Sequence, residues 1–213
     1  MTPDLPHMRS DYADTGLDET TAGADPVALF ERWLVDAVDA GVHEPNAMAL
    51  ATATPDGRPS SRIVLLKGFD ADGLVFFTGY ESRKGRELTA NPQAAATMLW
   101  HPMQRQVRVE GAVTRVDVAE SDAYFASRPR GAQISAAASP QSEAIADRSV
   151  LDARRDEVEG VFEGHDVVRP PGWGGYRLSL DVVEFWQGRS GRFHDRLRYV
   201  QGEAGWDRQR LAP

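Results

Sequence analysis

The spacing of hydrophobic residues predicts a series of short β-strands over the first half of the chain. Apolar segments alternate with turn sequences such as Pro55-Asp56-Gly57 and the turn built on Asp70, Asp72 and Gly73, which are typical of hairpins. We expect strands over residues 47–54, 60–67, 74–78, 94–100 and 106–116. Because no crossover helices alternate regularly with these strands, we expect an antiparallel sheet curled into a barrel.

Helical periodicity predicts four helices beside this sheet. The first begins at Asp25-Pro26, where a good N-cap residue is followed by proline at the first helical position. Phe30, Trp33 and Leu34 form the main part of its apolar face, and Gly41 ends it. Further helices are expected over residues 82–90, 118–127 and about 149–162. The segment 131–142, which is rich in Gly, Ala and Ser, is expected to be a loop.

The last section of the chain returns to strand-like patterns after Pro170-Pro171-Gly172. Strands are expected over residues 182–187, 192–199 and 206–211. The first 24 residues are polar and lack sustained periodicity, which is typical of a flexible arm. The sequence therefore predicts an arm (1–24) followed by a single domain (25–213), mainly β with peripheral helices (α+β).

The composition excludes several classes of function. The chain has 213 residues, a formal net charge of -8 and no cysteine, which argues against a nucleic-acid or anionic-membrane surface and excludes disulfides and thiolate chemistry. No apolar run approaches membrane-spanning length and the N-terminus lacks a signal-peptide core, so a cytoplasmic protein is expected. The sequence has no histidine pair at helical metal-ligand spacing, no GxSxG motif and no Walker loop. No metal site is therefore predicted.

Positive charges are concentrated in the stretch from Arg62 to Gly85. Arg62, Lys67, Arg83 and Lys84 stand where apolar runs begin or end, and the only two lysines of the chain are among them. Lysine serves well as a point-charge partner of phosphate, whereas arginine favours forked contacts. Two interpretations remain open: a phosphate-binding unit, or a solvated hairpin with charged ends.

Further candidate groups follow later in the chain. Arg128 and Arg130 precede the small-residue segment 131–142, where backbone amides could approach an anion. In an extended segment Arg192, His194 and Arg196 would share one face, which favours an anionic or aromatic ligand. Each group also has an ordinary structural interpretation. Together with the lack of a nucleophile, these groups favour a bound phosphorylated cofactor that carries the chemistry.

The chain resembles the pyridoxine/pyridoxamine 5′-phosphate oxidase family. The resemblance rests on the joint order and spacing of several motifs: RIVLLK (62–67), FFT (76–78), SRKG (82–85), RQV (105–107), YF..RPR (124–130), QS (141–142), WGGYR (173–177), EFWQGR..R.HDR (184–196) and the terminal RLAP. These motifs run from Arg62 to the last residue. With the helix at Asp25, the resemblance covers nearly the whole chain.

The resemblance implies a split β-barrel and a homodimer with FMN at the subunit interface. It also implies an oxidase that converts pyridoxamine or pyridoxine 5′-phosphate to pyridoxal 5′-phosphate. In this family a hydride equivalent passes from the C4′ carbon of the substrate to FMN, and O₂ then reoxidises the flavin and yields H₂O₂. The implied partners are thus the phosphorylated vitamer, O₂ and a second copy of the chain.

The resemblance also implies roles for individual residues, by match of position. FMN would be bound by Arg62, Ile63, Val64, Leu65, Leu66, Lys67, Phe77, Thr78, Arg83, Lys84, Gln106, Gln141, Ser142, Trp186 and Arg196. The substrate would be bound by Arg9, Ser10, Asp11, Tyr12, Lys67, Tyr124, Arg128, Arg192 and His194, and the last two would lie against the pyridine ring as the catalytic pair.

Two departures from the family pattern concern the substrate pocket. Ala132 stands where the family usually has serine, and Ser135-Ala136-Ala137 stands where it usually reads Gly-Ala-Trp. For this reason two alternatives stay open: an FMN oxidase of the kind found in phenazine biosynthesis, and a non-catalytic split-barrel protein that binds flavin or pyridoxal phosphate. A purely structural dimer is a third.

Strand geometry suggests a division of labour between the cationic residues. Arg62 and Lys67 are five positions apart, so in a regular strand they point to opposite faces. We expect Arg62, Arg83 and Lys84 to bind the phosphate of FMN, and Lys67 to bind that of the substrate.

Overall fold

The computed structural model describes residues 4–7, 11–13 and 15–213. The chain divides into two compact units, each described by itself below. Unit 1 contains the described residues up to Ala49, Ala96–Glu110 and Leu180–Pro213, and unit 2 contains Leu50–Ala95 and Gly111–Ser179. Three strands contribute residues to both units: β1 (Ala47–Ala53), β5 (Gln93–Trp100) and β6 (Arg105–Arg115).

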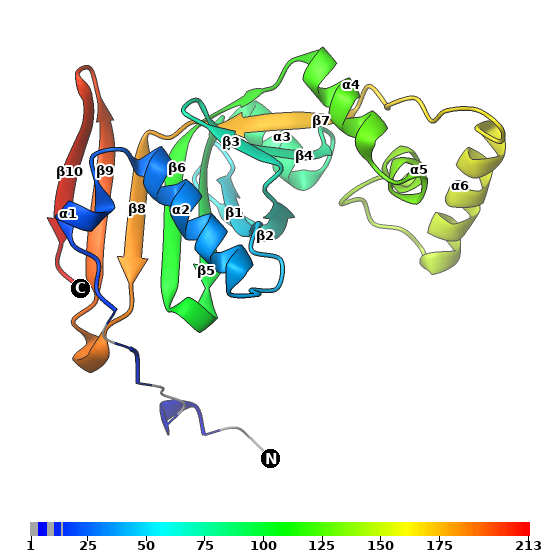
Figure 1. Ribbon diagram of the computed structural model, residues 1–213. Helices are drawn as coiled ribbons and strands as arrows, with labels where there is room; N and C mark the ends of the chain where they lie inside the picture. Colours follow the sequence, from blue (N-terminus) through cyan, green and yellow to red (C-terminus); the bar gives the residue numbers. More distant parts are fainter. Residues whose placement is uncertain (1–3, 8–10, 14) are drawn as a thin grey trace. The chain divides into compact units, whose positions relative to one another are not determined.

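Unit 1 is built on antiparallel strands from the end of the chain. The N-terminal half of β6 pairs with β8 (Val182–Gln187), β8 with β9 (Asp195–Gly202), and β9 with β10 (Gly205–Leu211). Figure 1 shows β8, β9 and β10 side by side. Three short 3₁₀ turns also belong to this unit: η1 (Leu5–His7), η2 (His101–Met103) and η3 (Ser190–Arg192).

Helix α2 (Pro26–Asp39) covers the core of unit 1 and begins as predicted. The side chain of Asp25 accepts a hydrogen bond from the backbone N–H of Val27 at 2.8 Å, and proline occupies the first turn. Phe30 and Trp33 are buried, and the ring of Trp33 meets that of Phe185 edge to face, with centroids 5.2 Å apart.

The segment before α2 contains a short helix, α1 (Glu19–Ala22), capped by the side chain of Asp18. Glu19 forms an ion pair with Arg210 of β10, between Oε1 and Nε at 2.7 Å. Leu17 and Ala22 are buried. Residues 17–22 are thus packed and paired within unit 1, while residues 1–3, 8–10 and 14 lie outside the described part of the chain.

Unit 2 contains a second antiparallel set of strands: β2 (Pro59–Leu65), β3 (Gly68–Asp70), β4 (Gly73–Gly79) and β7 (Trp173–Leu178). β4 pairs with β3 and β7, and β7 also pairs with the C-terminal half of β6. The sequence did not predict β7, because two adjacent glycines weaken a strand pattern. These glycines are required by packing: a Cβ atom on Gly174 would lie 2.0 Å from Oη of Tyr80.

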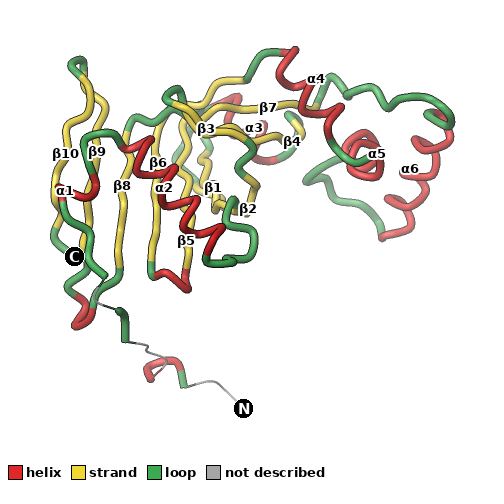
Figure 2. The backbone as a smooth tube through the Cα atoms, in the orientation of Figure 1, coloured by secondary structure: helices red, strands yellow, loops and turns green. Residues whose placement is uncertain are grey.

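Four helices complete unit 2: α3 (Arg83–Ala90), α4 (Val118–Ser127), α5 (Arg130–Ala138) and α6 (Arg148–Val161) (Figure 2). A hydrophobic cluster of Phe125, Ile134, Val167 and Trp173 packs beside α4 and α5. The expected loop over 131–142 was therefore wrong for residues 131–138. Its alanines are strong helix formers, and Ile134 anchors the helix in this cluster.

The predicted fold class, mainly β and antiparallel with peripheral helices, is confirmed. The strand expected over 192–199 begins only at Asp195, because residues 190–192 form η3 and Arg192 has a positive φ of 63°. Val38, which continues the helical spacing of Phe30, Trp33 and Leu34, is nevertheless 57% exposed. Among the described residues, no helix combines the length and apolarity needed to cross a bilayer.

Candidate functional site

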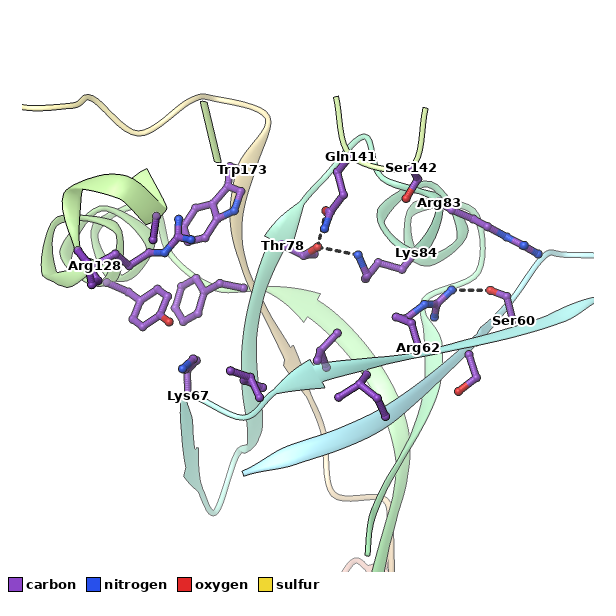
Figure 3. Close-up of a pocket in the computed structure, with 18 residues that line it drawn as sticks. Ser60, Arg62, Lys67, Thr78, Arg83, Lys84, Arg128, Gln141, Ser142 and Trp173 are labelled. Atoms are coloured by element: carbon purple, nitrogen blue, oxygen red, sulfur yellow. Dashed lines mark hydrogen bonds between the residues drawn. The ribbon is translucent and has the colours of Figure 1, made fainter. Parts of the chain in front are cut away.

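A cavity of about 820 Å³ in unit 2 gathers most of the residues predicted to bind FMN (Figure 3). We call it the main cavity. Its lining comes from β2 and the residues just after it, β4, the first turn of α3, the end of α4, the start of α5, the segment after α5 and the start of β7. The lining residues are Ser60, Ser61, Arg62, Ile63, Val64, Leu65, Lys67, Phe77, Thr78, Arg83, Lys84, Tyr124, Arg128, Pro129, Ala132, Gln141, Ser142 and Trp173.

One end of the main cavity is formed by the start of α3. Ser82 is the N-cap residue, and its Oγ accepts a hydrogen bond from the backbone N–H of Gly85 at 3.3 Å. This cap places Arg83 and Lys84 in the first helical turn, where backbone N–H groups and the helix dipole favour an anion. Arg62 reaches the same end from β2 (Figure 3). We call this group of three cations the helix end.

Lys84 carries a charge in an unfavourable environment. The residue is only 6% exposed, and its Nζ donates to two neutral hydroxyl oxygens, Oγ1 of Thr78 at 2.9 Å and Oγ of Ser82 at 3.4 Å. Burial, and then the nearby charge of Arg62, lower the pKa of Lys84 from 10.5 to about 8. An anion at this end would stabilise the charged ammonium.

The opposite end of the main cavity carries Lys67 and Arg128 (Figure 3). The guanidinium of Arg128 lies over Trp173, 4.8 Å from the ring centroid. Its Nη1 is buried and lacks a hydrogen-bond partner in the described part of the chain, and burial lowers the pKa of this residue. Beside it, the rings of Tyr124 and Phe77 stack with centroids 3.9 Å apart. We call this the aromatic end.

The wall between the two ends includes Gln141. Its Oε1 accepts hydrogen bonds from Oγ1 of Thr78 at 2.9 Å and from the backbone N–H of Gly79 at 3.1 Å. Thr78 thus contacts both Gln141 and Lys84. Ser142, which follows, has a positive φ of 75°, and both residues line the cavity.

Arg62 and Lys67 both line the main cavity, although alternation in a regular strand would place them on opposite faces. Consecutive residues of β2, from Ser60 to Leu65, line the cavity, so both faces of the strand contribute to it, and β2 itself ends at Leu65. Lys67 lies beyond the strand, and its backbone N–H donates to the carbonyl of Val75 on β4. Leu66, the one member of the predicted 62–67 run that does not line the cavity, is buried.

Three more predicted FMN residues lie in unit 1, in a single row across adjacent strands. Gln106 on β6 is the register partner of Trp186 on β8, which is in turn the partner of Arg196 on β9. Arg196 donates through Nε to Oε1 of Glu184 at 2.8 Å. The row therefore depends on strand register rather than on sequence proximity.

Two of the predicted substrate residues, Tyr12 and His194, form an aromatic group with Trp186 of this row. The ring of His194 lies 4.7 Å from that of Trp186 and 5.5 Å from that of Tyr12, centroid to centroid. Nδ1 of His194 accepts a hydrogen bond from the backbone N–H of Arg189 at 3.1 Å. The nitrogen Nε2 is thereby the one that can carry the proton of the neutral ring.

The predicted common face of Arg192, His194 and Arg196 was wrong, because these residues do not share one extended segment. Arg192 has left-handed backbone geometry at the end of η3, and β9 begins only at Asp195. Asp11 is described and exposed, whereas the predicted substrate residues Arg9 and Ser10 lie outside the described residues.

Sequence reasoning missed several residues of the main cavity. Ser60 lies two positions before Arg62 on the same strand, so period-two alternation could have found it. Trp173 belongs to the WGGYR motif (173–177) but has no predicted role, yet its ring lies under the guanidinium of Arg128. Of the departures from the family pattern, Ala132 lines the main cavity. Ser135, Ala136 and Ala137 line a separate cavity of about 420 Å³ in the same unit, which also touches Arg128.

Comparison with known families matches two consecutive segments of the chain. Residues 34–162 match the family described as pyridoxamine 5′-phosphate oxidase. Residues 173–213 match the pyridoxine 5′-phosphate oxidase C-terminal dimerisation region.

Curated relatives match the chain over its full length. A pyridoxine/pyridoxamine 5′-phosphate oxidase of Rubrobacter xylanophilus is 55% identical over 210 residues, which cover 99% of this chain and 97% of the relative. The protein of the same name from Methylibium petroleiphilum is 53% identical over 214 residues, covering all of both chains.

Solved structures share the fold of this chain. The structure of PhzG from Burkholderia lata 383, in complex with tetrahydrophenazine-1-carboxylic acid, has a TM-score of 0.88 and 36% identity over 94% of this chain and 100% of that one. A pyridoxamine 5′-phosphate oxidase-related, FMN binding protein from Nostoc punctiforme shares the fold at a TM-score of 0.69 and 18% identity, over 86% of this chain and 97% of that one. With these matches, the chain belongs to the pyridoxamine 5′-phosphate oxidase family.

Proposed function

We propose that this chain is an FMN-dependent oxidase that converts pyridoxamine or pyridoxine 5′-phosphate to pyridoxal 5′-phosphate, with O₂ as acceptor and H₂O₂ as product. The enzyme class predicted from the sequence is confirmed by two relatives named pyridoxine/pyridoxamine 5′-phosphate oxidase, which are 55% and 53% identical over 99% and 100% of this chain. The observation in the structure that carries the proposal is the main cavity with cations at both ends. Two phosphate-bearing molecules, a cofactor and a substrate, suit such a cavity.

The residues of the main cavity fit a flavin mononucleotide. The helix end offers Arg62, Arg83 and the desolvated Lys84 to a phosphate, and charge-assisted hydrogen bonds contribute about 1.5–3 kcal/mol each. The walls from Ile63 to Leu65 are apolar, which suits a planar ring. When bound, FMN would supply the redox chemistry: it would take a hydride equivalent from the substrate, and its reoxidation by O₂ with one further proton would yield H₂O₂.

The aromatic end fits the phosphate of the substrate. Arg128 has a buried nitrogen without a partner among the described residues, and Lys67 is exposed toward the same space. A phosphate here would satisfy the Arg128 guanidinium and offset the cost of its burial. Tyr124, stacked on Phe77, holds the wall against which the substrate is oriented. Orientation of this kind lowers the barrier by preorganising the reactants.

We propose that the enzyme is a homodimer with FMN at the subunit interface. The match to a C-terminal dimerisation region over residues 173–213 supports the dimer. That region contains Trp186, Arg192, His194 and Arg196, the residues assigned to the flavin and the pyridine ring. The proposal also includes the cytoplasmic location expected from the sequence.

An aerobic assay tests this function. The purified protein, supplied with FMN, is expected to be yellow and to convert both phosphorylated vitamers to pyridoxal 5′-phosphate, with one H₂O₂ formed per product. Product absorbance and peroxide are measured in the same samples, and the unphosphorylated vitamers serve as control substrates. Bound FMN without turnover of either phosphate would contradict the proposal.

The phenazine-type oxidase remains the second candidate because of the match to PhzG at a TM-score of 0.88. This candidate is the weaker one, because the chain is 36% identical to PhzG but 55% and 53% identical to the two pyridoxine/pyridoxamine 5′-phosphate oxidases. A reduced phenazine carboxylate belongs in the same assay. Faster peroxide formation with this compound than with pyridoxamine 5′-phosphate would favour the second candidate.

Replacing Arg192 or His194 by alanine is expected to lower kcat/KM about 10- to 100-fold while FMN remains bound. The reason is that both are assigned to the pyridine ring, and a misplacement of the reacting groups by about 1 Å can cost up to about 100-fold in rate. Turnover and flavin content are measured on the same preparation.

The matched control is Gln201→Ala, an exposed residue on β9, which is expected to change neither quantity. If Arg192→Ala and His194→Ala lost flavin in proportion to activity, their assignment to the substrate would be wrong.

A further inference from the structure

Glu87 does not line the main cavity, yet it contacts two arginines that do. It lies one turn after Arg83 on α3 and is only 5% exposed. Its Oε1 accepts a hydrogen bond from Nε of Arg83 at 2.9 Å, and its Oε2 lies 3.3 Å from Nη2 of Arg62. One carboxylate therefore connects the two arginines of the helix end.

Two hydroxyl groups complete the network around Oε2. Oγ1 of Thr52 donates to it at 2.5 Å and Oγ of Ser60 at 2.6 Å. Both hydroxyl protons point to Glu87, so the lone pairs of the two hydroxyl oxygens can accept hydrogen bonds from Arg62. Nη1 of Arg62 donates to Oγ1 of Thr52 at 2.6 Å, and Nη2 donates to Oγ of Ser60 at 2.5 Å. The orientation of both hydroxyls, and through them of Arg62, depends on an acceptor at position 87.

The carboxylate stays ionised under ordinary conditions. Burial raises the pKa of Glu87, but the hydrogen bonds from Ser60, Thr52, Arg83 and Arg62 outweigh it and lower the pKa from 4.5 to about 2. A buried carboxylate needs such compensation. At neutral pH the network is therefore complete.

The two arginines differ in how much they depend on this carboxylate. Arg62 also donates to the carbonyl of Leu50 at 3.1 Å and has a 20% exposed side chain, whereas that of Arg83 is 60% exposed. A long, exposed side chain loses rotamer freedom when it binds a ligand, and fixing it beforehand removes part of that cost. Arg83 thus gains most from Glu87.

We propose that Glu87 is a positioning residue that holds the guanidinium groups of Arg62 and Arg83 toward the phosphate of FMN. This inference rests on the proposed function. It assigns Glu87 no contact with the flavin itself. The contribution is specific for the phosphate, because both arginines lie at the helix end.

Comparing FMN with riboflavin tests this role, because riboflavin lacks only the phosphate. In Glu87→Gln the amide oxygen can still accept from the hydroxyls, but the amide N–H₂ then faces the donor Nε–H of Arg83. The dissociation constant of FMN is expected to rise about tenfold, while that of riboflavin is unchanged. Both are measured by flavin fluorescence with the apoprotein, and circular dichroism verifies folding.

A matched control and two further variants complete the design. Glu159→Gln makes the same change on α6, where Glu159 forms an (i, i+4) ion pair with Arg155 at 3.8 Å. This variant is expected to bind FMN and riboflavin with unchanged affinity. Glu87→Asp keeps the charge but is too short to reach all its donors, so an intermediate loss of FMN affinity is expected. If Glu87→Gln does not fold, Glu87→Asp tests the inference in its place. In an Arg83→Met background, Glu87→Gln is expected to have a smaller effect than in the wild type.

The outcomes separate this inference from the proposed function. A parallel loss of FMN and riboflavin binding, or full additivity with Arg83→Met, would show a merely structural role and overturn the inference. Tighter FMN binding by Glu87→Gln would also overturn it, because repulsion of the phosphate would then outweigh positioning. If the wild type bound FMN no better than riboflavin, the proposed phosphate site itself would fail.

Discussion

Replacing Lys84 by methionine is expected to weaken FMN binding about 10- to 100-fold, the range for losing one charge-assisted hydrogen bond. The folded apoprotein should be at least as stable as the wild type. The ammonium of Lys84 is desolvated and bonded only to the neutral hydroxyls of Thr78 and Ser82, and methionine has a similar length without the buried charge. Fluorescence titration with FMN and thermal unfolding of the apoprotein measure the two effects.

Arg86→Met is the matched control on the same helix. Arg86 is exposed and donates to the backbone carbonyl of Glu81, so its replacement is expected to leave FMN affinity unchanged. Wild-type affinity in Lys84→Met would refute the assignment of the helix end to the FMN phosphate.

The lowered pKa of Lys84 also predicts how FMN binding depends on pH. The pKa in the apoprotein is about 8, and a bound phosphate favours the protonated amine. FMN affinity is therefore expected to be highest below pH 8 and to fall above it, by at most about tenfold per pH unit. Lys84→Met should lack this decrease. For the stability of the apoprotein the sign is opposite. Between about pH 8 and 10.5 the unfolded state, with a pKa of 10.5, binds more protons than the folded state, so Lys84 makes stability rise with pH in that range.

Replacing Gly85 by alanine is expected to destabilise the apoprotein by about 2–3 kcal/mol, the upper part of the usual range for overpacking. A Cβ atom at this position would lie 2.0 Å from the carbonyl oxygen of Tyr80 and 2.8 Å from that of Gly79. Both neighbours are backbone atoms, so the first turn of α3 must shift. Because Arg83 and Lys84 lie in that turn, FMN affinity is expected to fall as well. Thermal unfolding should show a midpoint about 5–10 °C lower.

Gly160→Ala provides the comparison on another helix. A Cβ atom on Gly160 of α6 meets nothing within 4 Å, so alanine is expected to be neutral or to stabilise the protein by up to about 1 kcal/mol. Equal stability losses in the two variants would mean that close packing at Gly85 is not the cause.

Much of the fold was predictable from local patterns. Asp25 and Pro26 mark the start of α2, because the hydrogen bond of the N-cap side chain and the fixed φ of proline both act within the first turn. Hydrophobic segments between turn sequences predicted most strands of the sheet. β7 and α5 were not predicted because their residue types are determined by packing against residues distant in the sequence. Gly174 is small because Tyr80 packs against it, and the small residues of α5 are helical around the buried Ile134.

The sequence predicted which residues line the candidate site better than it predicted how they are arranged. Eleven of the fifteen residues predicted for FMN line one cavity, namely Arg62 to Leu65, Lys67, Phe77, Thr78, Arg83, Lys84, Gln141 and Ser142. The geometry of Lys67 and Arg192 was missed because both lie just outside a strand that the pattern extended by a few residues. Glu87 was missed because a glutamate four positions after an arginine is typical of an exposed helix pair, and its burial becomes visible only when Thr52 and Ser60 are placed beside it.

The register that aligns Gln106, Trp186 and Arg196 has a consequence for how such an enzyme can diversify. These three positions are set by hydrogen bonding between β6, β8 and β9, whereas Arg192 and His194 lie in the connection between β8 and β9. Insertions or deletions in that connection would change the residues that we propose to face the substrate but leave the strand pairing intact. Under the proposed function, new substrate preferences can therefore evolve by replacement of this loop while the three residues proposed to bind FMN stay in place.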